Sequence, residues 1–280
     1  MQKLNHQDIK AQSFLNSWFL CKKPHNTFLL ASLISIKHSL IMKLKVASWN
    51  MGHWMHRSVA QKAWNYLDTV IAADISLVQE SAPPVERQKK FCVWREIGGS
   101  RKWGSGVMTK EFPVTEIKLE KNDYPGALVV TDVTLPDKTT LVVVSMYGQL
   151  DKHGYSITTL HRMLSDLTHL FEGDLRPGRR PKVILGGDFN ASPQWDDKYA
   201  VKTHRIFFQR LEAFGLVDCQ GQFTKERSRT FRNRRNFPWV DDYIFASKSL
   251  AKNVVAHQVV EQAEILNLSD HNPVVVTFDL

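Results

Sequence analysis

Short apolar runs that read as β-strands recur along the chain, and they limit its possible folds more than any other feature. Turn formers such as Pro125-Gly126 and Pro136-Asp137 separate them. The predicted strands cover 43–48, 75–78, 91–94, 106–109, 127–135, 140–147, 183–185, 240–246, 254–260 and 273–278. They do not alternate regularly with helices, so the pattern favours two sheets packed face to face over a parallel βαβ fold.

Apolar residues at helical spacing predict a few helices to cover the outside of these sheets. They lie at 60–71, from Ser156 to 171, and at 204–214, where Gly215 ends the last one. Ser156 is the predicted N-cap of the second helix. The fold class is therefore mixed α/β (α+β), with mainly antiparallel sheets inside and helices outside.

The composition fits one large globular domain with an anionic partner. The chain has 280 residues, of which 43% are hydrophobic and 23% charged, and this excludes disordered and fibrous classes. The formal charge of +9 favours nucleic acid or a phosphorylated substrate. Three scattered cysteines supply neither a disulfide framework nor a zinc motif, so the reducing cytosol is expected.

Residues 1–42 differ from the rest and are predicted to be a leader outside the domain, which would cover 43–280. We expect a start-codon overcall or a non-functional extension, because the sequence from Met42 reads as a natural beginning before the first strand. The alternative is a secretion signal, since the apolar run 28–36 follows the basic pair Lys22-Lys23. That run is too short to span a membrane. A monomer is the default expectation.

Polar clusters follow the predicted strands at their ends. They are Trp49-Asn50, Gln79-Glu80, Tyr147, Gly187-Asp188-Phe189-Asn190, Asp241-Asp242 and Ser269-Asp270-His271. Taken singly, each is better explained by a turn or a solvated strand end. Taken together, carboxylates, carboxamides, a tyrosine and a histidine that converge on one edge indicate a site.

The motifs around these clusters resemble those of a known family. VASWNMG, LVQES, SMYG, ILGGDFNASP, VDDYIFAS and LSDHNPVVVTF are similar to the motifs of the endonuclease/exonuclease/phosphatase superfamily, over about residues 43–280. The resemblance implies a four-layered αββα sandwich. It also implies a divalent-metal site that hydrolyses phosphodiesters or phosphomonoesters.

The resemblance further implies a role for each site residue. Glu80 would hold Mg²⁺, with Mn²⁺ as a possible substitute, and Asn50 and Asp270 would lie close by. Asp188 would deprotonate the attacking water, and Asn190 would position it.

On the same resemblance, His271 would donate to a phosphoryl oxygen and Tyr147 would hydrogen-bond the phosphate. Asp242 would orient the ring of His271, and it is chosen over Asp241 because the family has its aspartate directly before Tyr, here Tyr243.

Two sequence features indicate which branch of the family the chain resembles most. Tyr147 stands where AP endonucleases and retrotransposon endonucleases have Tyr, whereas deoxyribonuclease I and sphingomyelinases have His. The chain departs from AP endonucleases at Gly52, where they have Asp, and at Tyr147-Gly148-Gln149-Leu150, where they have Tyr-x-Pro-Asn. Specificity for abasic sites therefore stays open.

An arginine-rich and aromatic segment, 225–239, precedes Asp242. Arginines that hold phosphates and aromatics that stack on bases are typical of nucleic-acid surfaces. The predicted substrate-binding residues are Arg232, Arg234, Arg235 and Trp239. The alternative is a solvated basic loop whose aromatics pack into the core.

The sequence thus predicts a Mg²⁺-dependent phosphodiesterase, in the first place a nuclease that cuts DNA or RNA by in-line attack of an activated water. A phosphatase or phospholipase is the enzymatic alternative. A non-catalytic nucleic-acid-binding module is the alternative from another class.

Overall fold

A computed structural model describes residues 42–53, 57–88, 91–151, 153, 156–172, 181–199, 201–224, 226–232 and 238–280. Within it, Met42–Leu280 forms one compact unit. The predicted leader falls almost wholly outside the described residues, and so do Arg234 and Arg235. In the described residues no helix has both the length and the apolarity needed to cross a bilayer.

The first sheet has six strands in the order β13-β14-β1-β2-β4-β3. Its strands are β1 (Lys43–Asn50), β2 (Ile75–Ser81), β3 (Cys92–Gly98), β4 (Arg101–Thr109), β13 (Val254–Val259) and β14 (Val274–Asp279). β1 and β2 pair in parallel, and the other neighbours are antiparallel. The sheet is therefore mixed but mainly antiparallel, as predicted.

The second sheet also has six strands, in the order β5-β6-β7-β8-β12-β9. They are β5 (Val114–Glu116), β6 (Leu128–Thr134), β7 (Thr140–Met146), β8 (Lys182–Asp188), β9 (Leu216–Asp218) and β12 (Asp242–Ser247). Only β7 and β8 pair in parallel among these neighbours. A separate two-stranded ribbon joins β10 (Phe231–Arg232) and β11 (Pro238–Trp239).

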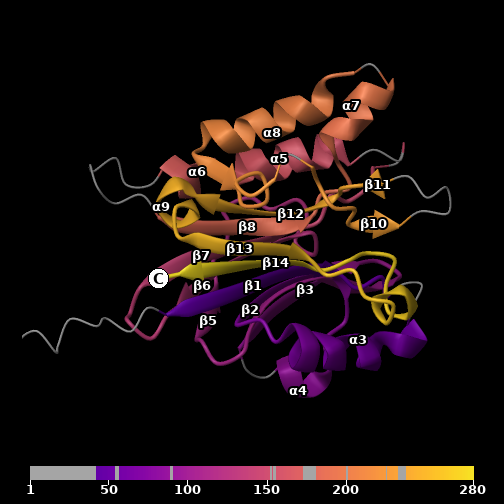
Figure 1. Cartoon of the computed structure of the whole chain (residues 1–280), viewed down its shortest axis with the longest axis vertical. Helices are drawn as coiled ribbons and strands as arrows, with labels where there is room; N and C mark the ends of the chain where they lie inside the picture. Colours follow the sequence, from indigo (N-terminus) through magenta and orange to yellow (C-terminus); the bar gives the residue numbers. More distant parts are fainter. Residues whose placement is uncertain are drawn as a thin grey trace, which may run out of the picture. The chain divides into compact units, whose positions relative to one another are not determined.

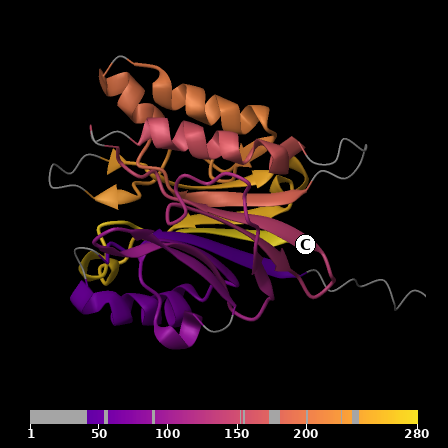
Figure 2. The ribbon, with the colours of Figure 1, turned by 180° about the vertical axis from the view of Figure 1, so that it is seen from behind.

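Helices cover the outer faces of both sheets, which confirms the predicted four layers (Figures 1 and 2). The first sheet is covered by η1 (Arg57–Val59), α3 (Ala60–Tyr66), η2 (Leu67–Ile71) and α4 (Val85–Gln88). Over the second sheet lie α5 (Ile157–Asp166), α6 (Thr168–Glu172), α7 (Pro193–Tyr199) and α8 (Thr203–Ala213). Two short elements, α9 (Lys248–Ala251) and η3 (Ile265–Asn267), complete the fold.

The alternation of side chains along each strand divides the core into layers. Val46, Leu77, Ile184 and Ile244 belong to a single buried cluster that draws on strands of both sheets. Their neighbours along the strands, such as Trp49 in β1 and Phe245 in β12, belong to the outer clusters that include helix residues. The same period of two puts Asn50, Asp188 and Asp242 on the inner faces, at one end of the sandwich.

One predicted local feature is confirmed in position only, because Ser156 is the N-cap residue of α5 without a side-chain cap. Ser156 precedes α5, but its hydroxyl makes no capping hydrogen bond to the helix. It donates instead to the backbone carbonyl of Asn190, at 2.6 Å. Ser156 thus fastens the start of α5 to the loop that follows β8.

Candidate active site

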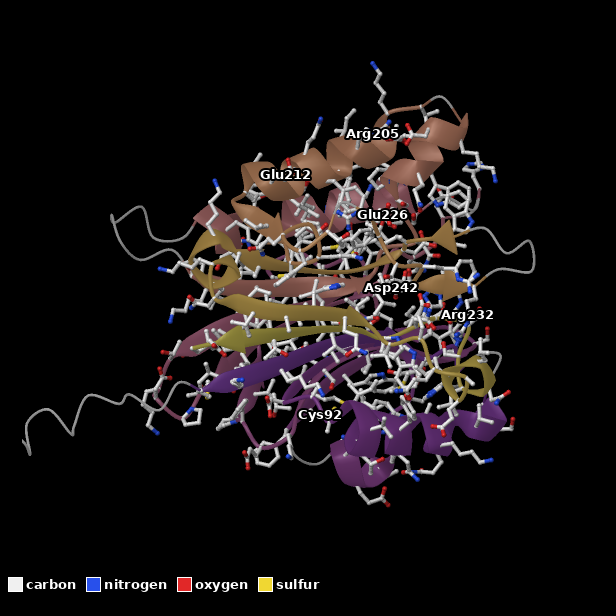
Figure 3. All side chains as sticks on the ribbon, viewed as in Figure 1. Cys92, Arg205, Glu212, Glu226, Arg232 and Asp242 are labelled. Carbon is white, nitrogen blue, oxygen red and sulfur yellow. The ribbon has the colours of Figure 1, made fainter. Side chains whose placement is uncertain are left out.

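The strand topology gathers the predicted site residues at one end of the two sheets. β1 and β2 run in parallel and end near Asn50 and Glu80, while β8 ends at Asp188 in the facing sheet. β12 is antiparallel to β8, and its register places Asp242 directly opposite Asp188. Figure 3 shows Asp242 and Arg232 toward the same end of the sandwich.

Asp188 is fully buried and receives several hydrogen bonds. The side-chain amide of Asn50 reaches across from the first sheet and donates to its Oδ2 at 2.7 Å. Asn190 donates twice, from its backbone N–H to Oδ1 at 2.8 Å and from its side-chain amide to Oδ2 at 3.1 Å. Burial raises the pKa of Asp188 well above its usual range, and Asp242 and Asp241 add to this. Asp188 is therefore a fixed carboxylate with enhanced basicity.

His271 and Asp242 form a buried pair. Nδ1 of His271 lies 2.8 Å from Oδ2 of Asp242, and Nε2 lies 3.8 Å from Oδ2 of Asp188. Burial alone would lower the pKa of His271, but the charges of Asp242 and Asp188 raise it well above its usual range. The ring is thus held as a proton donor, with Nε2 on the side of Asp188.

Glu80 and Tyr147 form a second buried pair. The hydroxyl of Tyr147 donates to Oε1 of Glu80 at 2.8 Å. Burial raises the pKa of Glu80, although the hydrogen bond from Tyr147 partly opposes this. Burial and the Glu80 charge also raise the pKa of Tyr147, which therefore remains a neutral donor. The structure thus directs the Tyr147 hydroxyl to Glu80, whereas the family resemblance implied the phosphate.

Two of the site residues adopt left-handed backbone conformations. Glu80 has φ 45° and Asn190 has φ 46°, values that side-chain-bearing residues adopt at an energetic cost. Glu80 lies where the β2–β4 register shifts between Val78 and Ser81, which indicates a bulge. Gly187 is required just before Asp188, because a Cβ there would lie 1.8 Å from the carbonyl oxygen of Met146.

Arg232 anchors the loop that carries Asp270 and His271. Its Nη1 donates to Oδ1 of Asn272 at 2.7 Å, and its Nη2 donates to the carbonyl of Ser269. Its backbone N–H donates to the carbonyl of Asp270 at 2.9 Å. Two of the guanidinium nitrogens are thus engaged within the protein, so the structure places Arg232 in a positioning role and not as a free phosphate ligand.

Trp239 lies in the core, with 4% of its surface exposed. Its ring stacks on Trp195 with a centroid separation of 4.2 Å, and the ammonium of Lys198 lies 5.1 Å from its centroid. An incoming base has no free face of this ring to stack on. The packing alternative therefore describes Trp239, and a role in substrate binding stays a prediction for this residue.

A cavity of about 410 Å³ joins the predicted residues to others that the sequence did not reveal. Its lining consists of Glu80, Arg101, Trp103, Tyr147, Leu150, Asp188, Asn190, Phe231, Asp270 and His271. Phe231 packs on His271 with ring centroids 4.8 Å apart. The sequence does contain one signal that Arg101 and Trp103 face the site. The Gly98-Gly99 turn marks the start of β4, and from there the alternation of side chains along the strand puts both residues on the inner face of the sheet.

The donor set suits a divalent cation. Glu80, Asp188 and Asp270 bring three carboxylates to the cavity, whose basic side chains are His271 and Arg101. Carboxylate oxygens are the ligands that Mg²⁺ and Mn²⁺ prefer. Asp188, Asp242 and His271 also place one ligand atom each within 4.8 Å of one another and could hold a metal. A proton on His271 would offset one of the two carboxylate charges of that trio, whereas Tyr147, which donates to Glu80, is neutral. The Glu80 and Asp270 side therefore carries the larger negative charge.

Comparisons with known proteins agree with this geometry. The sequence profile described as "Endonuclease/Exonuclease/phosphatase family" matches residues 47–271. A comparison with curated protein sequences gives no match. The match to the profile spans the whole site, from β1 to His271.

Solved structures with the same fold include several enzymes that act on nucleic acids. An AP endonuclease from Archaeoglobus fulgidus has a TM-score of 0.64 and 20% identity, and the alignment covers 85% of this chain and 100% of that one. The endonuclease domain of TRAS1, a telomere-specific non-LTR retrotransposon, has a TM-score of 0.61 and 18% identity, with coverage of 85% and 99%. The 3' phosphatase NExo from Neisseria, bound to a product DNA hairpin, has a TM-score of 0.64 and 22% identity, with coverage of 85% and 100%.

Proposed function

Since the chain belongs to the endonuclease/exonuclease/phosphatase family of phosphoester hydrolases, we propose that it is a divalent-metal-dependent nuclease. It would cut DNA or RNA by in-line attack of a water molecule on phosphorus. One observation carries the proposal: the carboxylate of Asp188 and the imidazole of His271 line the same cavity, each fixed by buried partners.

The side chains divide the work of hydrolysis between them. Asp188 accepts the proton of the attacking water, and Asn190 holds both that carboxylate and the water in place. His271 donates from Nε2 to a phosphoryl oxygen as negative charge builds there, while Asp242 fixes the ring through Nδ1. Tyr147 orients Glu80.

Glu80 and Asp270 would hold the Mg²⁺ or Mn²⁺ ion, with Asn50 beside them. A bound cation supplies charge stabilisation to the phosphoryl oxygens. Tyr147 donates to Oε1 of Glu80 and Asn50 also hydrogen-bonds this carboxylate, so the ion would share Glu80 with these two side chains. Asn50 contributes chiefly through its amide, which orients Asp188 from the opposite sheet.

Two observations favour a polynucleotide substrate. The chain carries a formal charge of +9, of which +5 belongs to residues 43–280, and a positive charge suits a polyanion. The similar structures include an AP endonuclease, a retrotransposon endonuclease and a phosphatase bound to DNA. Because the last of these is a 3' phosphatase, removal of a terminal phosphate from nucleic acid is the second candidate activity.

We further propose a reducing compartment, consistent with the free thiols of Cys92 and Cys219.

A cleavage assay of the full chain tests the proposal. It would use single-stranded, duplex and abasic DNA, RNA, a panel of phosphomonoesters and a phospholipid, each with Mg²⁺ or with EDTA. We expect Mg²⁺-dependent cleavage of at least one polynucleotide, with a rate that falls steeply as salt is added. Release of phosphate or a headgroup with no polynucleotide cut would instead favour a phosphatase or phospholipase. Tight binding of nucleic acid without turnover would favour a binding module.

Asp188→Asn should lower kcat by about 10²–10⁴-fold, because an amide cannot accept the proton of the water. His271→Ala should act in the same direction, since it removes the donor. Far-UV circular dichroism would show that both variants keep their fold. Activity close to wild type in either folded variant would contradict the assigned roles.

A further inference from the structure

The hairpin of β3 and β4 brings two further side chains to the cavity. Arg101 and Trp103 lie two residues apart on β4 and share the face of the strand that lines it. Lys102, between them, lies on the opposite face of the strand and forms an ion pair with Glu96 at 3.3 Å. The hairpin thus presents one cation and one indole to the site and turns a second cation away.

Trp103 is held against the site by an aromatic contact. Its ring meets the ring of Tyr147 edge to face, with centroids 5.9 Å apart and an interplanar angle of 86°. Tyr147 in turn donates to Glu80. Trp103 is only partly buried, so part of its surface remains open to a ligand.

Arg101 is a second basic side chain in the cavity lining, besides His271. Its guanidinium lies 5.4 Å from the centroid of the Trp103 ring, and in the part of the chain that the structure describes no carboxylate forms an ion pair with it. Arg87, Arg95, Arg205 and Arg227, in contrast, each pair with an aspartate or glutamate. Stacking on the indole limits the motion of the guanidinium and keeps its N–H groups available to an anion.

The cavity is also larger than one phosphate needs. Pockets that bury drug-sized ligands start at about 300 Å³, and this cavity measures about 410 Å³. The cleaved phosphate would occupy the side of Asp188 and His271. The rest of the lining, including Arg101 and Trp103, then faces the neighbouring part of the substrate.

We infer that Arg101 and Trp103 form a subsite for the phosphodiester group next to the one that is cleaved. The guanidinium of Arg101 binds the non-bridging oxygens of that neighbouring phosphate, and the indole of Trp103 packs against the sugar or base between the two phosphates. The inference rests on the proposed nuclease function and deepens it. The subsite selects substrates with at least two consecutive phosphodiester groups over isolated phosphoesters.

The test compares two substrates in the full-length protein with Mg²⁺. One is the polynucleotide that the wild type cuts, as a defined oligonucleotide, and the other is bis(p-nitrophenyl) phosphate, a diester with no neighbouring phosphate. Arg101→Ala should lower kcat/KM on the oligonucleotide at least about tenfold more than on the small diester, since a hydrogen-bonded charge is lost. It should also reduce the slope of log(kcat/KM) against log[salt] by about 0.7–0.9.

Matched variants separate the subsite from general effects. Lys102→Ala removes the adjacent exposed cation and should leave both substrates unchanged. Arg101→Lys keeps the charge without the planar guanidinium, so it should recover part of the loss. Trp103→Leu should lower kcat/KM on the oligonucleotide more than on the small diester.

A methylphosphonate scan of the oligonucleotide locates the contact. A neutral methylphosphonate at the contacted position should weaken cleavage by wild type as much as Arg101→Ala does, and it should cause no further loss in Arg101→Ala. An equal fall on both substrates, an unchanged oligonucleotide rate, or further loss in Arg101→Ala at every position would overturn the subsite. Wild type that hydrolyses only the small diester would overturn the nuclease function itself.

Discussion

At the scale of single residues, the site separates two kinds of buried acid. Asp188 and Asp242 lie beside the ring of His271, and their charges raise its pKa. Glu80 has a neutral tyrosine hydroxyl as its hydrogen-bond donor, and Asp270 lies with it in the cavity lining. The two sets therefore differ in charge balance, and this difference predicts which set binds the cation.

Replacing Glu80 should change the requirement for metal. Glu80→Gln keeps the size of the side chain but removes one of the charges that attract the ion. We expect the Mg²⁺ concentration for half-maximal activity to rise at least about tenfold, with much of kcat recovered at high Mg²⁺.

Glu86→Gln is the matched control, because Glu86 is exposed on α4 and should leave the Mg²⁺ titration unchanged. His271→Ala should lower kcat without moving the midpoint. A midpoint that moves with His271→Ala but not with Glu80→Gln would assign the metal to the group of Asp188, Asp242 and His271.

At the scale of elements, short connections position the catalytic side chains. The loop before β14 carries Asp270 and His271, and Arg232 of β10 holds it through three hydrogen bonds. Ser156, just before α5, holds the carbonyl of Asn190. The geometry of the site therefore depends on contacts that lie outside the reacting groups.

Loss of the Arg232 side chain should loosen the loop of His271. Arg232→Ala should lower kcat by about 10- to 100-fold, because small displacements of catalytic groups are costly. KM should change less than twofold. The fall should be alike for bis(p-nitrophenyl) phosphate and for the oligonucleotide.

The exposed Arg57 offers a control of equal charge change, and Arg57→Ala should leave kcat unchanged. Arg232→Lys should recover part of the activity, as it keeps one donor. An effect on KM alone, and only with polynucleotides, would instead support direct phosphate binding by Arg232.

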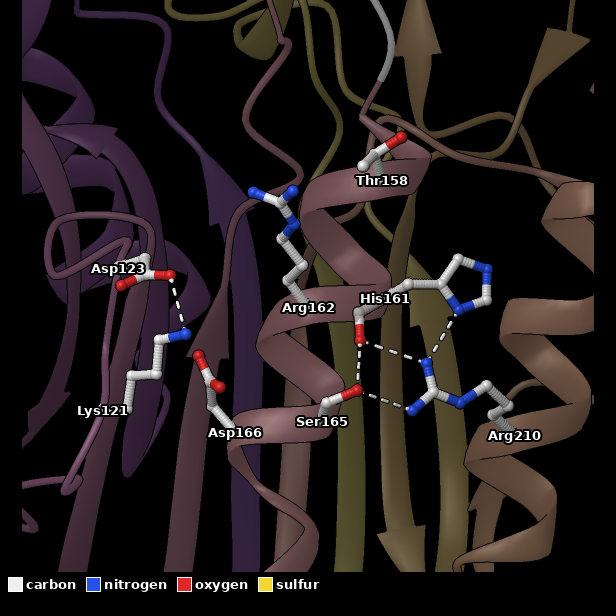
Figure 4. Close-up of a pocket in the computed structure, with 8 residues that line it drawn as sticks. All are labelled: Lys121, Asp123, Thr158, His161, Arg162, Ser165, Asp166 and Arg210. Atoms are coloured by element: carbon white, nitrogen blue, oxygen red, sulfur yellow. Dashed lines mark hydrogen bonds and ion pairs between the residues drawn. The ribbon is translucent and has the colours of Figure 1, made fainter.

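Helices α5 and α8 are joined by a pH-sensitive contact (Figure 4). Arg210 of α8 donates from Nη1 to Nδ1 of His161 at 2.8 Å and from Nη2 to the hydroxyl of Ser165 at 3.0 Å. The contact requires a neutral imidazole. Burial lowers the pKa of His161, and the charge of Arg210 lowers it further, whereas a hydrogen bond with the Thr203 backbone partly opposes this.

The contribution of this contact to stability should therefore fall as the pH falls, whereas the raised pKa values of Asp188 and His271 act in the opposite direction. The unfolded histidine titrates near pH 6.5 and binds its proton more readily than the folded one. The contribution is complete above that pH and is lost below it. Burial also lowers the pKa values of His204 and His257, which act in the same direction.

Urea unfolding at pH 7.5 and pH 5.5 measures this dependence. Relative to wild type, His161→Gln should shift the difference in unfolding free energy between the two pH values in favour of pH 5.5. The exposed His169 provides the control, and His169→Gln should leave that difference unchanged. An identical pH dependence in His161→Gln and wild type would contradict this interpretation.

At the scale of the whole molecule, the two sheets meet through an apolar layer that becomes polar toward the site. Gln79 of β2 and Ser145 of β7 are both fully buried, and the side-chain amide of Gln79 donates to the Ser145 hydroxyl at 3.0 Å across the interface. Asn50 and Asp188 make the next such contact. The polar pairs set the relative position of the sheets, and this position fixes the site.

The Gln79 and Ser145 pair can be tested with a double-mutant cycle. Ser145→Ala leaves the Gln79 amide buried without its partner and should lower the free energy of unfolding by about 1–3 kcal/mol. Adding Gln79→Leu should restore part of that loss, because no unsatisfied donor then remains. Additive losses in thermal or urea unfolding would show that the two side chains are not coupled.

Strand alternation and the polar ends of strands were sufficient to predict the layers and most of the candidate site. Asp188, Asp242, Glu80 and His271 all follow from such local patterns, read together with the family resemblance. Other features depend on long-range contacts that no local pattern contains. Arg232 and Trp239 belong to one basic aromatic segment and were both predicted to bind substrate. In the structure, Arg232 donates a hydrogen bond to Asn272, and Trp239 stacks on Trp195.

The left-handed backbone at Glu80 and Asn190 implies a conflict between durability and activity. Glycine tolerates that conformation at lower energetic cost, so Asn190→Gly would relax the chain while it removes an amide that holds Asp188. Selection for thermal stability alone would favour such replacements and would therefore enrich variants that are stable but inactive. Engineering of a more robust form should therefore leave these two positions fixed and seek its gains among the outer helices.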